Sequence, residues 1–227
     1  MELGLADRIV VVTGASKGIG FACAQAFVAD LSDAGQANAV IESVEAAVGP
    51  IDVLVSSAGA ARRYPPDELD AKAWHDAMDA KFFSYIHPLD AVVKRMGARG
   101  HGVVVNIIGA GGKTANPVHL PGGAANAALM LATAGLAVAY GPKGVRINAI
   151  NPGGTLTGRV QEGLAAESRM SGLSAEELLE RQQARIPLRR LGTPEEVAEV
   201  VLFLASPHAS YVTGAIIPMD GGAAAVI

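Results

Sequence analysis

The 227-residue sequence predicts an α/β fold, a doubly wound, Rossmann-like parallel sheet with helices on both faces. Short runs rich in Val and Ile alternate with helical patterns along the whole chain, as in successive βαβ units. The first run, at residues 9–12, stops at a glycine-rich turn, and a helix-forming stretch at 21–29 follows at once. Half of the residues are hydrophobic and only 18% are charged, so a large core can form in a single domain spanning 1–227.

The expected elements follow one another in a regular order. Apolar, β-branched runs that suit strands buried on both faces occur at 9–12, 51–55, 102–108, 145–150 and 215–218. Helical patterns lie at 21–29, from the start signal at 30–33 to about 48, at 71–96 (one or two helices) and at 124–140. Another helix begins at Thr193-Pro194-Glu195-Glu196, which supplies a cap and an acidic first turn. The polar region 155–189 is expected to be helical.

Composition excludes several classes of function. A net charge of −4 gives no electrostatic basis for binding nucleic acid or an anionic membrane. The apolar stretch 124–140 is shorter than the roughly 20 residues of a membrane span, so a buried helix is expected. The single cysteine, Cys23, and the absence of a signal-peptide pattern at 1–7 favour the cytoplasm. The five histidines show no metal-ligand spacing, so no metal site is predicted.

The glycine-rich turn has the spacing G-x-x-x-G-x-G. Gly14 allows a sharp turn, while Gly18 and Gly20 remove side chains that would keep a phosphate away from the backbone amides. The following helix would direct its unpaired N–H groups and positive dipole end at an anion in the turn. An ordinary strand-turn-helix is the alternative interpretation of this segment taken alone.

Five ordered motifs together resemble the short-chain dehydrogenase/reductase (SDR) family over nearly the whole chain. They are the cofactor turn at 13–20, an adenine-contacting pair at 30–31, Ser56-Ser57-Ala58-Gly59, Pro152-Gly153-x-x-x-Thr157, and the C-terminal pattern at 214–222. The resemblance implies an NAD(P)-dependent oxidoreductase acting on a small carbonyl or alcohol, with a 3-oxoacyl thioester as one option. The implied cofactor-binding residues are Thr13, Gly14, Ser16, Lys17, Gly18, Ile19, Gly20, Asp30, Leu31, Ser57, Ala58, Gly59, Pro152, Gly153 and Thr157.

The family's Ser, Tyr and Lys are not found where the resemblance puts them. Alignment on Asn106 places Gly109 at the Ser, Gly122 at the Tyr and Asn126 at the Lys. The family's helix asparagine falls on Lys81. Lysine and asparagine have therefore exchanged positions that, in the family, face each other across the site.

An exchanged pair suggests an atypical active site in which Lys81 supplies the cation and Asn126 takes the position of the lysine. His119, three residues before Gly122, is the candidate proton donor, because imidazole exchanges a proton near neutral pH. Lys113 and Tyr85 are weaker candidates. A solvated Lys81 and a His119 satisfied by the core or the surface are the plainer alternatives.

The junction of Ala29 and Asp30 is inconsistent with the resemblance. A helix over 18–29 would carry the chain roughly 18 Å from the cofactor edge, yet Asp30 belongs at that edge and one peptide step spans about 3.8 Å. We expect a segment to be missing between these two residues; the alternative is that the protein has lost two strands of the sheet. The residue that selects NAD or NADP would lie in the missing segment, so the sequence leaves the choice open; Lys17 could favour a 2′-phosphate.

Two function classes remain open at this stage. One is the oxidoreductase; the other is a non-catalytic homologue that binds a nucleotide or metabolite as a sensor or oligomer partner. The apolar helix at 124–140 is rich in small residues nearly all round, which predicts a homodimer or homotetramer. The expected partners are a small-molecule substrate and further copies of the chain.

Overall fold

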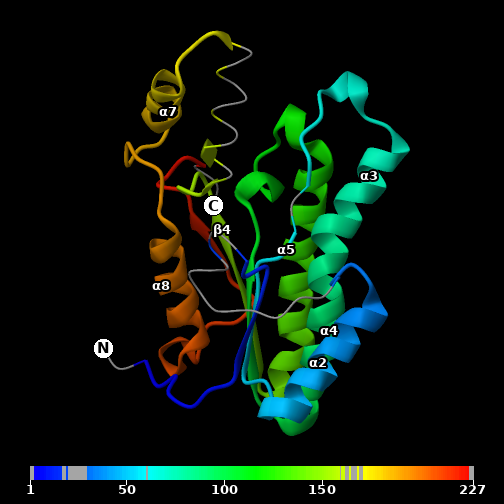
Figure 1. Ribbon diagram of the computed structural model, residues 1–227. Coiled ribbons are helices and arrows are strands. Elements are labelled where there is room, and N and C mark those ends of the chain that lie inside the picture. The colour runs from blue at the N-terminus through cyan, green and yellow to red at the C-terminus, as the bar shows by residue number, and fades with distance from the viewer. Residues whose placement is uncertain are drawn as a thin grey trace.

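The computed structural model describes residues 3–16, 19, 30–59, 61–158, 160, 161, 164, 168 and 171–224. Within them, five strands form one parallel sheet in the order β1-β2-β3-β4-β5 (Figure 1). The strands are β1 Val10–Thr13, β2 Val53–Ser56, β3 Gly102–Ile107, β4 Val145–Pro152 and β5 Ile216–Met219. The predicted parallel α/β sheet is confirmed, and each strand lies within one or two residues of its expected place.

Helices cover both faces of this sheet. In Figure 1, α2, α4 and α5 lie on one face and α8 lies on the other. The α-helices are α2 Ala34–Val48, α3 Ala71–Ala77, α4 Ser84–Arg99, α5 Leu120–Tyr140, α7 Ala175–Ala184 and α8 Pro194–Ala205. Short 3₁₀ turns are η1 Pro66–Glu68, η3 Ala110–Gly112, η4 Pro117–His119, η5 Gly141–Lys143 and η6 Pro207–Ala209. Two helices begin at the predicted start signals, since Asp33 caps α2 and Thr193 caps α8 with a complete capping box.

Each layer is held by a separate hydrophobic cluster. On one face, Leu54, Val104 and Ile147 of the strands pack against buried residues of α2 and α4. On the other face, Val55 and Val105 pack against Val201 and other residues of α8. Successive strand residues point to opposite faces, so the unbroken Val and Ile runs supply both clusters.

Strand β1 departs from the expectation of burial on both faces. Val10 is 42% exposed, and Val11 and Val12 are only half-buried. The reason is topological, since β1 pairs with β2 on one side and is the outer strand of the described sheet. Its other edge presents backbone groups with no strand partner among the described residues.

The predicted helical region 71–96 is three consecutive segments. Between α3 and α4 lies a π-helix, η2, at Met78–Phe83. Such wide turns are rare and frequently occur at functional sites. Lys81 lies within η2, and η2 packs against α5.

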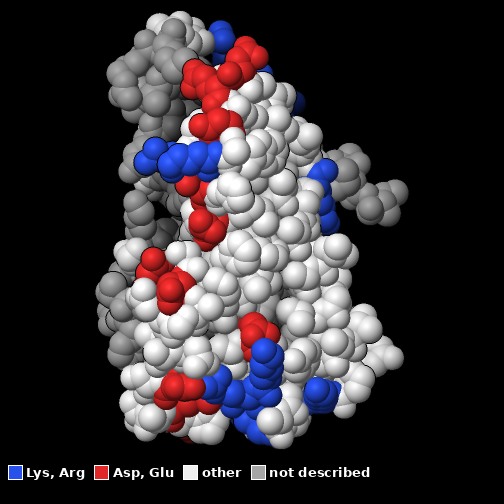
Figure 2. Space-filling model, turned by 90° about the vertical axis from the view of Figure 1, so that its right-hand side faces the viewer, with Lys and Arg blue, Asp and Glu red and all other residues white. Residues whose placement is uncertain are grey.

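Helix α5 and its flanking turns are long and apolar enough to cross a membrane by composition, and 39% of the most apolar window is buried. Within the described fold it is a core helix, because Leu129, Thr133 and Ala137 pack onto the sheet side. Leu131 and Val138 face outward and are 77% and 79% exposed. Figure 2 shows a broad area without charged side chains on this helix-covered face.

Candidate active site

Three turns that follow strands meet at the carboxyl edge of the sheet. Thr13 ends β1, and its hydroxyl and carbonyl oxygens both accept from the backbone N–H of Ser57, each at 3.2 Å. Gly14 has φ +67°, and a Cβ there would lie 2.6 Å from the Ala58 backbone nitrogen. Only glycine therefore allows the first turn to lie directly against the second.

Gly59 brings the second turn against the π-helix. It has φ +83°, and a Cβ at this position would collide with the carbonyl oxygen of Ala80. Ala80 immediately precedes Lys81, so this contact holds the backbone of Lys81 beside the Ser57-Ala58-Gly59 turn. The resemblance assigns that turn to the cofactor, and the structure brings Lys81 next to it.

Lys81 has specific partners and is not a solvated helix lysine. Its Nζ donates to the Tyr85 hydroxyl at 2.8 Å and lies 4.3 Å from the centre of the Tyr85 ring. The Tyr85 hydroxyl donates in turn to the carbonyl of Ile107, the last residue of β3, at 2.5 Å. Tyr85 is completely buried, so its proton cannot reach a substrate in this arrangement.

The imidazole of His119 lies against Gly122. A Cβ on Gly122 would come within 2.6 Å of His119 Nε2 and 2.8 Å of the Ala61 Cβ. A Cβ on Gly111 would be 3.4 Å from His119 Cδ2. The half-buried ring therefore occupies the space where any side chain at 122 would begin.

Asn126 occupies the corresponding space beside Gly109. Its Nδ2 lies 3.2 Å from the Cβ that Gly109 would carry and 3.8 Å from that of Gly111. The side chain is 4% exposed, and its Oδ1 has no hydrogen-bond partner among the described residues. A buried amide oxygen without a partner is rare and requires an explanation such as an ordered water or a ligand. His119 and Asn126 thus flank Gly111.

The third turn closes the edge at the end of β4. Pro152 is buried and pairs with Met219, and the Gly153 N–H donates to the Met219 carbonyl at 3.0 Å. A Cβ on Gly153 would lie 2.8 Å from the Cβ of Asp220. Thr157 is half-buried, and its carbonyl accepts from Val160 N–H at 3.0 Å, at the start of a helical turn.

The arrangement fits a nicotinamide dinucleotide. In open parallel sheets such ligands bind outside the carboxyl ends of the strands, where close backbone approach is needed. Gly14, Gly59 and Gly153 each lack room for a Cβ at that edge. The residues expected to hold the cofactor would be those of the three turns, with Thr157 and the amide of Asn126 nearby.

Some predicted cofactor residues are not placed in this way. Ser16 is exposed, and Leu31 and Ile19 are half-buried. The carboxylate of Asp30 accepts hydrogen bonds from Ser32 Oγ at 2.7 Å and from Ser32 N–H at 2.9 Å. These two hydrogen bonds lower the pKa of Asp30. Lys17, Gly18, Gly20, Cys23, the helix expected at 21–29 and the junction at Ala29 lie outside the described residues.

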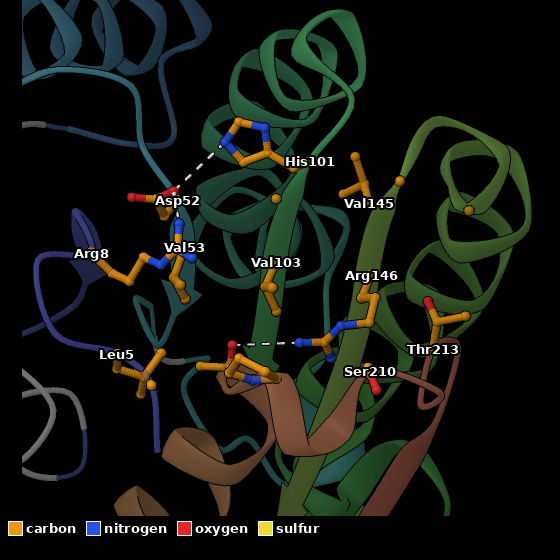
Figure 3. Close-up of a pocket in the computed structure, with 16 residues that line it drawn as sticks. Leu5, Arg8, Asp52, Val53, His101, Val103, Val145, Arg146, Ser210 and Thr213 are labelled. Atoms are coloured by element: carbon orange, nitrogen blue, oxygen red, sulfur yellow. Dashed lines mark hydrogen bonds and ion pairs between the residues drawn. The ribbon is translucent and has the colours of Figure 1, made fainter. Parts of the chain in front are cut away.

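A well-defined cavity lies at the opposite edge of the sheet. It has a volume of about 420 Å³ and lies where β2, β3 and β4 begin, with Asp52, His101 and Arg146 among its lining residues (Figure 3). Asp52 contacts Arg8 at 3.2 Å and His101 at 3.7 Å. Arg146 donates hydrogen bonds to the backbone carbonyls of Leu204 and Ser206 at the end of α8. Within the described part of the chain, no group of three or more His, Cys, Asp or Glu could hold a metal.

Comparisons with known proteins identify the family of the chain. The family model described as "Enoyl-(Acyl carrier protein) reductase" matches residues 18–224. The chain is 34% identical to 2-(S)-hydroxypropyl-CoM dehydrogenase 3 of Xanthobacter autotrophicus over 227 residues, covering all of this chain and 85% of that protein. It is 33% identical to cis-4-hydroxycyclohexanecarboxylate dehydrogenase of Sinomonas cyclohexanicum, in an alignment of 263 positions that covers both chains fully.

A solved structure extends the likeness to the fold. Gluconate 5-dehydrogenase of Burkholderia cenocepacia, in complex with NADP and tartrate, superposes with a TM-score of 0.86 at 27% identity, over 97% of this chain and 96% of that one. The fold and the carboxyl-edge site define an NAD(P)-dependent oxidoreductase. The chain belongs to the short-chain dehydrogenase/reductase family.

Two features of the site were not anticipated. From the sequence, Tyr85 is only a weaker candidate acid, and no pattern predicts the contact between His119 and Gly122. The four-residue spacing of Lys81 and Tyr85 was a usable signal, since such pairs share one helix face. The contact at Gly122 depends on how η4 enters α5, which no local pattern specifies.

Proposed function

We propose that the protein interconverts a secondary alcohol and its ketone, with His119 as proton donor and acceptor. Its imidazole fills the position where a side chain at Gly122 would begin, and this observation supports the proposal most directly. General acid–base groups of this kind contribute about 100-fold or more to a rate. The hydride is supplied or taken up by the bound nicotinamide.

Lys81 and Asn126 have separate roles in this proposal. The ammonium of Lys81, held beside Gly59 through Ala80, stabilises negative charge that develops on the substrate oxygen. The Asn126 Nδ2 lies where a side chain on Gly109 would begin, and it orients the substrate oxygen by donating a hydrogen bond. The usual Ser, Tyr and Lys would thus be replaced by Asn126, His119 and Lys81.

The substrate class is inferred from the relatives together with the site. Two relatives are named for hydroxyl-bearing substrates, and the solved gluconate 5-dehydrogenase holds tartrate. A 3-oxoacyl thioester is the second candidate, because a relative 34% identical over 196 residues is the 3-oxoacyl-[acyl-carrier-protein] reductase of Thermotoga maritima. Parallel assays with 2-hydroxy or polyol substrates and with acetoacetyl thioester would decide between them.

Self-association through α5 is part of the proposal. Ala124, Ala127, Leu131, Gly135 and Val138 form an outward stripe without a charged residue. Small residues at this spacing let two helices approach closely, and burial of Leu131 and Val138 against a second copy would remove their exposure to water. The proposed assembly is a homodimer or homotetramer, and the proposed compartment is the cytoplasm.

We also infer a segment between Ala29 and Asp30 that the sequence lacks. The outer edge of β1, which has no strand partner among the described residues, supports it, as does the alignment of 263 positions against a chain of 227 residues. Such a segment would pair with β1 and carry the residue that selects NAD or NADP. Residues 18–61 contain no Lys or Arg, so a tryptic peptide with the mass of 18–62 would contradict the inference.

The catalytic assignment is tested with four variants. NADH and NADPH are first titrated by nicotinamide fluorescence, which identifies the preferred cofactor. His119→Gln and Lys81→Met should each lower kcat about 100-fold while cofactor affinity stays within a few-fold. His101→Gln, an exposed histidine at the opposite edge, is the matched control. Full activity in a His119→Ala, Lys81→Ala double variant would refute the assignment.

A further inference from the structure

Tyr85 links Lys81 to the backbone of the central sheet. The Ile107 carbonyl that accepts its hydroxyl proton lies at the end of β3. Ile107 pairs with Ile150 on the β4 side, but the pairing of β2 with β3 ends one residue earlier, at Ser56 and Asn106. The hydroxyl therefore satisfies a carbonyl that lies beyond the last residue pair with β2.

The direction of these hydrogen bonds is fixed by chemistry. A tyrosine hydroxyl has one proton, and the carbonyl of Ile107 can only accept. The hydroxyl oxygen must then accept from Lys81, whose Nζ is only a donor when charged. Because Tyr85 is completely buried and its ring contacts the cation at 4.3 Å, this anchor has little freedom to move.

We propose that Tyr85 is a positioning residue that fixes the Lys81 ammonium at the carboxyl end of β3. The proposal rests on the function assigned above to Lys81. The hydrogen-bonded chain starts at the carbonyl of Ile107, two residues before Gly109, and runs through the Tyr85 hydroxyl to Lys81 Nζ. Asn126 lies beside Gly109. A flexible lysine side chain is thereby held in one place, so that the cation is already in position when the substrate oxygen becomes negative.

The π-helix contributes to the same arrangement. Ser84 Oγ donates to the Ala80 carbonyl at 3.0 Å and to the Lys81 carbonyl at 3.3 Å. Gly59 packs against the same Ala80 carbonyl, and a Cβ there would also lie 2.8 Å from Ser84 Oγ. The backbone of Lys81 is therefore held by the cofactor-side turn while its side chain is held by Tyr85.

A double-mutant cycle separates positioning from other roles. Tyr85→Phe removes only the hydroxyl and should lower kcat about 10-fold, with KM and cofactor affinity little changed. Lys81→Met should lower kcat about 100-fold, and the double variant should be no worse than Lys81→Met. Tyr85→Leu, which also lacks the hydroxyl, should give the same result if Tyr85→Phe is poorly folded.

Tyr140→Phe is the matched control, because Lys143 Nζ lies 4.9 Å from the Tyr140 ring at the far end of α5. It should leave kcat unchanged. Losses that multiply to about 1,000-fold in the double variant would mean that Tyr85 acts independently of Lys81, and the positioning role would be wrong. Full activity of Lys81→Met would instead refute the assignment of Lys81 on which the proposal rests.

Discussion

Replacement of Gly122 by alanine should displace the proposed acid, His119, without changing its chemical identity. The added Cβ would lie 2.6 Å from His119 Nε2 and 2.8 Å from Ala61 Cβ. That Cβ would also collide with His119 Cε1, and ordinary non-bonded contacts are about 3.5–4.0 Å, so the imidazole must move by more than about 1 Å. Since His119 is a side chain with two rotatable bonds, it is expected to yield before the backbone of α5 does.

A displacement of this size is small for folding and large for catalysis. Misplacement of a reacting group by about 1 Å costs about 100-fold in rate, equivalent to about 2.7 kcal/mol in the activation free energy. Alanine in place of glycine within a helix contributes about 1 kcal/mol to stability, which offsets part of the steric cost. Gly122→Ala should therefore remain folded within about 1 kcal/mol of the parent and lose about 100-fold in kcat.

The assay combines urea unfolding with steady-state kinetics at saturating cofactor. Gly141→Ala is the matched control, since a Cβ there meets nothing within 4 Å and its φ of −55° suits alanine. A Gly122→Ala variant with unchanged kcat, at a stability close to that of the parent, would refute the assignment of His119 as the acid. An equal loss in Gly141→Ala would show that the effect is not specific to the site.

Three further predictions concern the rest of the fold. Arg146→Met should lower the free energy of unfolding in urea by about 2–3 kcal/mol, because Arg146 donates to carbonyls at the end of α8, including that of Leu204 at 2.8 Å. Arg190 and the Thr193 N–H hold the pKa of Glu196 at about 2, below its ordinary value of 4.5. Ionised Glu196 therefore stabilises the folded state fully above its ordinary pKa of 4.5, and this stabilisation is lost as the pH falls towards about 2. The melting temperatures of the parent and of Glu196→Gln should accordingly differ at pH 6 and converge near pH 2. Leu131→Glu should give a smaller species than the parent in sedimentation velocity, and an unchanged assembly would exclude the α5 interface.

The fold could be predicted because its signals are local and repeated. Each strand is a short Val- and Ile-rich run, and the starts of α2, α3, α7 and α8 carry side-chain caps, as at Asp33 and Thr193. The burial of β1 was predicted wrongly, because a run of apolar residues does not reveal whether a strand is central or outermost. That distinction depends on which segments pair, and pairing is a property of the whole sheet.

The candidate site could be predicted only in outline. The turns at Gly14, Gly59 and Gly153 follow from glycine spacing, and the structure explains each by a contact that excludes a Cβ. The partner of Lys81 could not be found in the same way. It depends on the π-helix between α3 and α4 and on the carbonyl of Ile107, which is distant in sequence.

The empty positions at Gly109 and Gly122 have a common physical explanation. Loss of a catalytic side chain would normally leave a cavity, and unfilled space costs stability. Here a neighbouring polar group enters each space, with Asn126 Nδ2 at 3.2 Å from a Cβ on Gly109 and His119 Nε2 at 2.6 Å from one on Gly122. Because the second approach is possible only with glycine, His119 and Gly122 form a matched pair, and restoration of tyrosine at 122 alone would displace the histidine. In this proposal, Asn126, His119 and Lys81 constitute one alternative arrangement of the site, in which the position of His119 depends on Gly122.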